Sequence, residues 1–348
     1  MACLVAAALA EIGDAWSLLI LRSALLGRTR FTQFREDLRI SRGRLSERLD
    51  HLVTEDLLSL DRYSETRSEY RLTEKTLDLY PAIMLLRSWG EHWLRSGRPP
   101  SQLLVHGCGA PLEAKAICGH CLGEIRACDC DYSPGTGAFD LSELNLRSTR
   151  RSSSANAIRK RAESPSANAL AVIGDRWTFV ILRAMFSGAK RFDDMHAQIG
   201  IARNVLADRL RTSETNGLIS RRAYQLRPIR HEYELTEMGR DLYPSTLALV
   251  DWANRWIARG PKDKVGLRHL SCKRRLALRV ICACCREDIS PHDVTVTMAD
   301  GAQATKIRSK AASPTIRTKT EASSPAGKMP RRLAGPVSVR IRNPAMKR

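Results

Sequence analysis

The chain carries the same segment twice. Residues 9–27 (LAEIGDAWSLLILRSALLG) and 170–188 (LAVIGDRWTFVILRAMFSG) are identical at 10 of 19 positions, with no gap and an offset of 161 residues. The similarity continues further along both copies, for example in YRLTEKTLDLYP (70–81) and YELTEMGRDLYP (233–244). Solenoid repeats span only about 20–50 residues. The spacing therefore indicates that a whole small domain is duplicated, and the differences between the copies become informative.

The first copy predicts a definite order of elements. Apolar residues recur at helical spacing from Leu9 to Ile20, which predicts a first helix. A short helix over 32–38 follows, and Ser41 is the expected N-cap of a helix that ends near Glu55. Two short strands, 58–62 and 69–72, and another helix from Thr73 complete the copy. Two short helices, a tight turn and a two-stranded hairpin describe a winged helix-turn-helix, whose recognition helix enters the major groove of DNA.

The motifs of both copies resemble a known family. GD-x-W-x3-ILR, then RF, then I-[SA]-R-x2-L-[SA]-[DE]-RL, EY-x-LT and LYP are similar to the HxlR-type family of bacterial transcription regulators, over roughly 3–95 and 164–258. The resemblance implies a winged-helix domain that binds double-stranded DNA and pairs through its terminal helices. It also implies a transcriptional regulator, with repression the expected mode, rather than an enzyme. Family members pair as homodimers; here the two copies could instead pair within one chain.

The expected fold class is mainly α with small β sheets. It consists of two tandem winged helix-turn-helix domains, each followed by a small zinc-ribbon-like module. The expected parts are 1–98 (first winged helix), 99–132 (first module), 133–163 (linker), 164–260 (second winged helix), 261–300 (second module) and 301–348 (disordered basic tail).

The two predicted recognition helices differ on their outward face. Opposite the leucine stripe of the first lie Gly43 and Asp50, where the second has Asn204 and Arg211. Arginine can hydrogen-bond guanine bidentately, and asparagine can do the same with adenine. The second copy therefore has more side chains that can recognise specific bases. The candidate DNA-binding residues, taken from both helices and both wings, are Arg42, Arg44, Arg48, Arg62, Arg67, Arg203, Asn204, Arg209, Arg211, Arg222, Arg227 and Arg230.

Two alternatives to this interpretation stay open. The arginines could form only a solvated helix face, as charged residues on exposed helices do. The first copy, whose surface is nearly neutral in charge, could dock a protein partner while the second alone binds DNA. A metal-dependent enzyme is disfavoured, because the sequence suggests no general base and no open coordination position.

A cysteine pattern follows each winged helix. Cys108, Cys118 and Cys121 recur as Cys272, Cys282 and Cys285 at a constant offset of 164 residues. A Cys-x2-Cys step suits a zinc knuckle, so we expect two structural zinc sites, one per copy, rather than ordinary reduced thiols. The fourth ligand is open: His106 and His269 precede the first cysteine of each set, whereas Cys128 and His292 align with each other without a gap.

Cys3 lies near the start of the first predicted helix, where Ser164 stands in the second copy. In several proteins of the family that the chain resembles, a cysteine at this place senses oxidants or electrophiles. A helix N-terminus can lower the pKa of a thiol and raise its reactivity. Cys3 is therefore the candidate redox sensor, with an inert terminal thiol as the alternative.

Charge is concentrated at the end of the chain. The net charge is +20, and residues 260–348 hold 20 basic and 6 acidic residues. The tail is either merely solvated or a sequence-independent contact for DNA phosphates. The sequence has no apolar run of about 20 residues, the length needed to span a membrane, and it does not indicate a signal peptide. We therefore expect a cytoplasmic, nucleoid-associated protein with reduced cysteines.

Overall fold

The computed structural model describes residues 4–64, 67–94, 102–133, 165–173, 176–227, 229–298 and 305–306. Almost all of the predicted linker, most of the predicted basic tail, and Cys3 lie outside the described residues. The expectations placed on them remain predictions.

The first repeat has the predicted order of helices and strands. Its elements are α1 (Leu4–Ile12), α2 (Ala15–Leu25), α3 (Phe31–Leu38), α4 (Arg42–Thr54), β1 (Leu58–Ser64), β2 (Arg67–Leu72), α5 (Glu74–Leu77) and α6 (Tyr80–Trp93). β1 and β2 form the antiparallel wing, and the leucine stripe of α4 is fully buried.

Two predicted helices are each divided in two. The helix expected from Thr73 forms α5 and α6, and the first predicted helix forms α1 and α2. Gly13 has a φ of 91°, in the left-handed region that favours glycine. Asp14 then caps α2, because its carboxylate accepts hydrogen bonds from the backbone N–H groups of Trp16 (3.0 Å) and Ser17 (3.2 Å). The chain therefore turns between α1 and α2, and α1 is free to pack elsewhere.

The second repeat follows the same order. Its elements are α8 (Pro165–Ile173), α9 (Arg176–Phe186), α10 (Phe192–Ile199), α11 (Arg203–Thr215), β6 (Ile219–Leu226), β7 (Ile229–Leu235), α12 (Glu237–Arg240) and α13 (Tyr243–Trp256). β6 and β7 form the second wing. The order predicted from the repeated sequence is confirmed in both copies.

Helices of the two repeats pack on each other reciprocally. α1 packs on α13, its counterpart α8 packs on α6, and α6 also contacts α13. The indole N–H of Trp89 donates to the carbonyl oxygen of Met238 (2.9 Å), and the equivalent Trp252 donates to that of Lys75 (2.8 Å). Each tryptophan and each acceptor therefore has its counterpart in the other repeat, so the contact is approximately two-fold symmetric.

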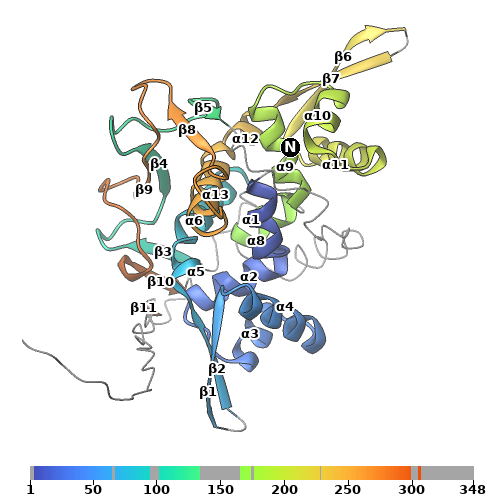
Figure 1. The fold of residues 1–348 in the computed structure, drawn as a ribbon. Helices are drawn as coiled ribbons and strands as arrows, with labels where there is room; N and C mark the ends of the chain where they lie inside the picture. The colour runs from blue at the N-terminus through green and yellow to red at the C-terminus, as the bar shows by residue number, and fades with distance from the viewer. Residues whose placement is uncertain are drawn as a thin grey trace, which may run out of the picture. The chain divides into compact units, whose positions relative to one another are not determined.

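The segments after the winged helices interlock. They contain β3 (Gln102–His106), β4 (Ala114–Cys118) and β5 (Cys130–Ser133) in the first repeat, and β8 (Gly266–His269), β9 (Leu278–Cys282), β10 (Val294–Met298) and β11 (Thr305–Lys306) in the second. β3 pairs with β10, β4 with β9 and β5 with β8, all antiparallel. In Figure 1 the teal strands of the first repeat accordingly lie beside the orange strands of the second.

This pairing differs from the separate module expected after each winged helix. Each of these three pairs takes one strand from each repeat, because antiparallel partners are supplied by the other copy rather than by a hairpin within the same copy.

Over the described residues, no single helix is long and apolar enough to cross a membrane; α1 and α2 reach that length and apolarity only together, across a 67° bend.

Candidate nucleic-acid interface and metal clusters

The recognition helix of the second repeat, α11, has one buried and one exposed face. Leu206 and Leu210 are buried against the domain, which is the expected result of their i, i+4 spacing. Arg203, Asn204 and Arg211 are exposed on the outside, and the side chains of Arg203 and Arg211 are 62% and 75% exposed. The predicted outward face of α11 is therefore exposed.

Arg203 is oriented by its neighbours without being buried by them. Its guanidinium bonds the carboxylate of Asp193 at 2.8 Å and stacks over the Phe192 ring, 4.9 Å from the centroid. An exposed ion pair of this kind contributes only about 0–1 kcal/mol. Arg203 can therefore exchange this carboxylate for another anion at little cost.

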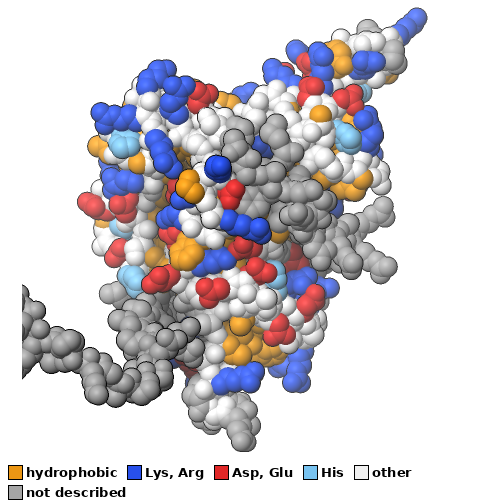
Figure 2. All heavy atoms as spheres, viewed as in Figure 1, with side chains coloured by type: hydrophobic (Ala, Val, Ile, Leu, Met, Phe, Trp, Pro, Cys, Tyr) orange, Lys and Arg blue, Asp and Glu red, His pale blue; other side chains and the backbone are white. Residues whose placement is uncertain are grey.

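The wing of the second repeat adds further positive charge. Arg222, Arg227 and Arg230 are exposed on it, and Figure 2 shows Lys and Arg side chains gathered over this hairpin, at the upper right. Arg191 stacks over the ring of Tyr224, 4.6 Å from its centroid. The wing thus offers both basic and aromatic groups at its surface.

The first repeat presents a different outward face. On α4, Arg42, Gly43 and Asp50 are exposed. Arg44 is half-buried, with its guanidinium 6.0 Å from the centroid of the Trp16 ring. On the wing, Arg62 is exposed, whereas the side chain of Arg67 lies outside the described part of the chain. Among the described side chains of helix and wing, the first repeat therefore exposes fewer of the predicted arginines than the second.

Two predicted DNA-binding arginines have structural partners. Arg48 bonds the α2 cap Asp14 at 2.9 Å, and its side chain is 18% exposed. Burial disfavours its charge, but Asp14 and Glu47 outweigh this effect and raise the pKa of Arg48. The equivalent Arg209 is 15% exposed and bonds Asp208 at 3.3 Å. The helical pattern placed both beside the leucine stripe, and the structure shows them turned toward the domain.

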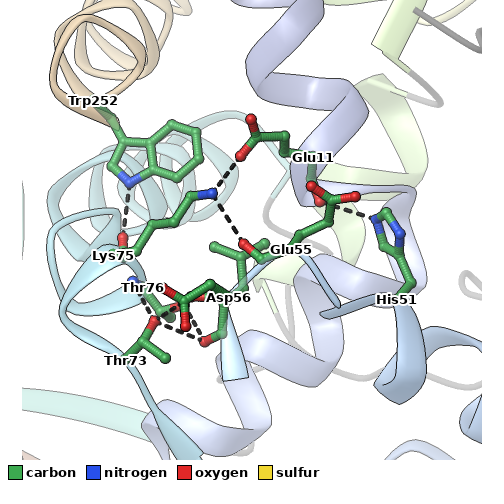
Figure 3. A network of polar contacts seen from close by, with 9 residues as sticks. Glu11, His51, Glu55, Asp56, Thr73, Lys75, Thr76 and Trp252 are labelled. Atoms are coloured by element: carbon green, nitrogen blue, oxygen red, sulfur yellow. Dashed lines mark hydrogen bonds and ion pairs between the residues drawn. The ribbon is translucent and has the colours of Figure 1, made fainter. Parts of the chain in front are cut away.

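A polar network connects α1 to α5 and the C-terminal end of α4 in the first repeat, and to α13 of the second repeat (Figure 3). The ammonium group of the buried Lys75 bonds the carboxylate of Glu11 and the carbonyl oxygen of Glu55 (2.9 Å). It also lies 5.8 Å from the centroid of the Trp252 ring. The sequence analysis did not single out Lys75. A comparison of the two copies could have identified this ion pair. Both of its partners are replaced in the second repeat, where Val172 and Met238 stand in place of Glu11 and Lys75.

The eight predicted metal ligands form two clusters. One contains His106, Cys108, Cys282 and Cys285; the other contains Cys118, Cys121, His269 and Cys272, and the ligand atoms of each lie within 4.8 Å of one another. Each cluster therefore combines two residues of the first repeat with two of the second. This grouping differs from the one expected from spacing, in which each copy holds its own site.

The structure also places the two candidates for the fourth ligand. His106 and His269 are buried in the clusters. Cys128 is exposed, with its Sγ 3.9 Å from the carbonyl oxygen of Phe186, and His292 is exposed in a short turn before β10. Among the described residues, the histidines before the first cysteines are thus the ones that meet the thiols.

The ligand pairs occupy tight turns that present them to the cluster. The backbone N–H of Ala110 is the main reason that the pKa of Cys108 is lowered to about 6, and His106 lowers it further. Such N–H contacts favour the thiolate form, which is the form that binds metal.

Comparison with known proteins identifies the duplicated domain. The model of the HxlR-like helix-turn-helix family matches residues 11–98 and again 172–261. The chain belongs to the HxlR-like helix-turn-helix family. It is a DNA-binding transcriptional regulator of this family and not an enzyme.

Relatives of this HxlR-like chain are regulators too. An uncharacterized HTH-type transcriptional regulator of Mycobacterium tuberculosis is 39% identical over 136 residues, 39% of this chain and 86% of the relative. The uncharacterized HTH-type regulator YtfH of Escherichia coli is 35% identical over 91 residues, 26% of this chain and 72% of YtfH. The solved structure of the redox regulator HypR in its reduced form is 36% identical, with a TM-score of 0.25, over 26% of this chain and 94% of HypR.

Proposed function

We propose that the second repeat supplies most of the DNA affinity and sequence reading of this regulator. Arg203, Asn204 and Arg211 of α11 would contact base edges in the major groove, and the arginines of the β6–β7 wing would contact backbone or the minor groove. The first repeat would contribute a weaker contact through Arg42, Arg44 and Arg62.

The observation that carries this proposal is the exposed cationic face of α11 next to a cationic wing. The opposite face of α11 is closed by buried leucines. On α4 the corresponding outward positions are Gly43 and Asp50, which offer no cation, and Asp50 would repel phosphate. Charge and hydrogen-bonding capacity therefore favour the second repeat.

Two matched triple variants of the full chain test the proposal. Duplexes selected by the wild-type chain from a random-sequence library serve as probes, and fluorescence anisotropy at about 0.1 M salt measures the affinity. A base contact by arginine is worth about 1–3 kcal/mol, so Arg203→Ala/Arg211→Ala/Arg230→Ala should weaken binding about 100-fold or more. Arg42→Ala/Arg44→Ala/Arg62→Ala should weaken it by less than about 10-fold. Equal losses, or the reverse ranking, overturn the proposal.

We also propose that the two repeats act as an intrachain pair in place of a homodimer. The reciprocal tryptophan hydrogen bonds and the strand pairs support this, because they occupy on one chain the contacts that two subunits would otherwise exchange. Light scattering at low micromolar concentration should give the mass of a single chain, 38.9 kDa. A stable dimer at that concentration contradicts intrachain pairing.

The ligand chemistry of the two clusters supports zinc as their metal, in structural sites. Three thiolates and one imidazole are a known structural zinc set, and four protein ligands leave no position open for a catalytic water. Metal analysis of the purified chain should find about two zinc ions, one for each cluster. Clearly less than one per chain would eliminate both sites.

A further inference from the structure

Each of the four ligand pairs lies at the end of a strand, in a tight turn. The pairs His106/Cys108 and Cys118/Cys121 follow β3 and β4, and His269/Cys272 and Cys282/Cys285 follow β8 and β9. In the last three turns, a backbone N–H donates back to the carbonyl of the first ligand: Leu122 to Cys118 (2.8 Å), Lys273 to His269 (2.9 Å) and Arg286 to Cys282 (2.9 Å).

The residue directly after the second ligand has a positive φ in all four turns. These residues are Gly109 (84°), Leu122 (59°), Lys273 (59°) and Arg286 (63°). A positive φ is uncommon for leucine, lysine and arginine and persists only where the surroundings fix it. All four turns therefore share this backbone feature, and in each cluster the ligand atoms of two such turns lie within 4.8 Å of one another.

The strand pairing brings these turns together across the repeats. In the antiparallel pair β4–β9, Ala114 lies opposite Cys282 and Cys118 lies opposite Leu278. The Cys118 turn and the Cys282 turn therefore lie at opposite ends of the pair. Each meets a histidine-containing turn of the other repeat, because Cys285 lies beside His106 and Cys121 lies beside His269.

The distances across the repeats fit one tetrahedral ion per cluster. Zn–S bonds of about 2.3 Å and Zn–N bonds of about 2.05 Å at tetrahedral angles require S···S and S···N separations of about 3.8 and about 3.6 Å. The Sγ atoms of Cys118 and Cys272 are 3.9 Å apart. Cys285 Sγ lies 3.4 Å from His106 Nδ1, and Cys121 Sγ lies 3.4 Å from His269 Nδ1.

We propose that two zinc ions clasp the repeats together, each ion bound by one ligand pair from the first repeat and one from the second. This inference rests on the proposed zinc sites and adds the sharing of ligands to them. It assigns zinc a role in holding the intrachain pair, since neither repeat alone offers more than two ligands to either ion.

Two double variants distinguish the shared sites from one site per repeat. Cys108→Ser/Cys282→Ser removes two ligands of one shared cluster, whereas Cys108→Ser/Cys118→Ser removes one ligand from each. After dialysis against a zinc chelator of moderate affinity, the first variant should keep one zinc, half the wild-type content, and the second should keep none. If each repeat instead held its own site, the zinc contents of the two variants would rank in the opposite order. That result would overturn the sharing of ligands between repeats, but not the zinc sites themselves. A wild-type chain without zinc overturns both.

The exposed Cys128 and Cys284 belong to neither cluster, so Cys128→Ser/Cys284→Ser is the matched control and should keep both ions. A second measurement needs no variant. The wild-type chain is partially stripped of zinc and alkylated, and molecules retaining one ion are sequenced by mass spectrometry. In each molecule Cys108, Cys282 and Cys285 should be modified together or protected together. Joint modification of Cys108, Cys118 and Cys121 would overturn the clasp.

Discussion

Ala116 and Val280 lie opposite each other in the antiparallel pair of β4 and β9, and they occupy the same position in their repeats, 164 residues apart. Only a two-fold relation places equivalent residues of two copies face to face in an antiparallel ladder. The approximate two-fold axis therefore passes between these residues. It also relates the two candidate metal clusters, and it relates the hydrogen bond of Trp89 to that of Trp252.

The buried indole hydrogen bonds should contribute measurably to pairing of the repeats. Trp252→Phe removes the donor to the Lys75 carbonyl at a fully buried position. An unsatisfied buried acceptor costs about 1–3 kcal/mol, so the free energy of unfolding in urea, measured with zinc present, should fall by that amount. Trp256→Phe is the control, because Trp256 is 38% exposed and water can replace its bond to Asp78. An equal loss from both variants would contradict this reading.

The second repeat indicates how the Lys75 network can be replaced. Lys75→Met alone removes the cation from Glu11 and should lower the free energy of unfolding by about 1–3 kcal/mol. Replacing both partners of an ion pair by apolar groups is often neutral. Glu11→Val/Lys75→Met, which copies Val172 and Met238, should therefore recover at least half of that loss. Strictly additive losses in the double-mutant cycle would show that the pair is not coupled.

Two glycine substitutions should change thermal stability in opposite directions. A Cβ at Gly13 would lie 2.6 Å from the hydroxyl oxygen of Ser17, at a φ of 91°, so Gly13→Ala should lower the melting temperature and cost more than about 1 kcal/mol. Gly43 lies within α4, and a Cβ there meets nothing within 4 Å. Gly43→Ala should stabilise the chain by about 0.5–1 kcal/mol. A rise in melting temperature for Gly13→Ala would refute the assigned role of that turn.

Exchanging the outward residues of the recognition helices should exchange part of their function. Asn204→Gly/Arg211→Asp gives α11 the residues of α4, and we expect affinity for selected duplexes to fall about 10-fold to 1,000-fold. Gly43→Asn/Asp50→Arg makes the reverse change and should tighten binding, because a phosphate-repelling carboxylate becomes a cation. Anisotropy titrations check both, and tighter binding by the first variant would contradict the assignment.

Removal of the metal should loosen both repeats at the same place. Chelation should speed hydrogen exchange at the backbone N–H groups of β4 and β9 together, because each strand leads into a different cluster. The buried core around Leu45 and Leu206 has no ligand in either cluster and should remain protected. Faster exchange in only one of the two strands would be inconsistent with ligands shared between the repeats.

Much of each winged helix was predictable, because its pattern is local. The stripe of Leu45, Leu49 and Leu52 indicated which face of α4 is buried, and all three are fully buried. The division between α1 and α2 was not predicted, because the apolar periodicity continues across Gly13. Its signal was Gly13-Asp14, a glycine followed by a good N-cap residue.

The candidate metal clusters were predictable in composition and not in connectivity. Spacing identified the histidines and cysteines, but the distance in sequence from Cys108 to Cys118 is the same whether they bind one ion or two. That choice depends on which strands pair across the chain, which spacing within one copy does not determine. Similarly, the helical pattern of Arg48 gave no sign of Asp14, a partner 34 residues away.

Strand pairing between the repeats delays folding during synthesis of the chain. β3 ends at His106, but its partner β10 begins at Val294. At about 5–20 residues per second, the first half leaves the ribosome roughly 10–40 s before its partner strand exists. During that interval the thiols of Cys108, Cys118 and Cys121 lack their companions from the second repeat. The unpaired first half can therefore bind other metal ions, or pair with the corresponding strands of neighbouring nascent chains. Subunits that each pair their own strands do not have this period of exposure.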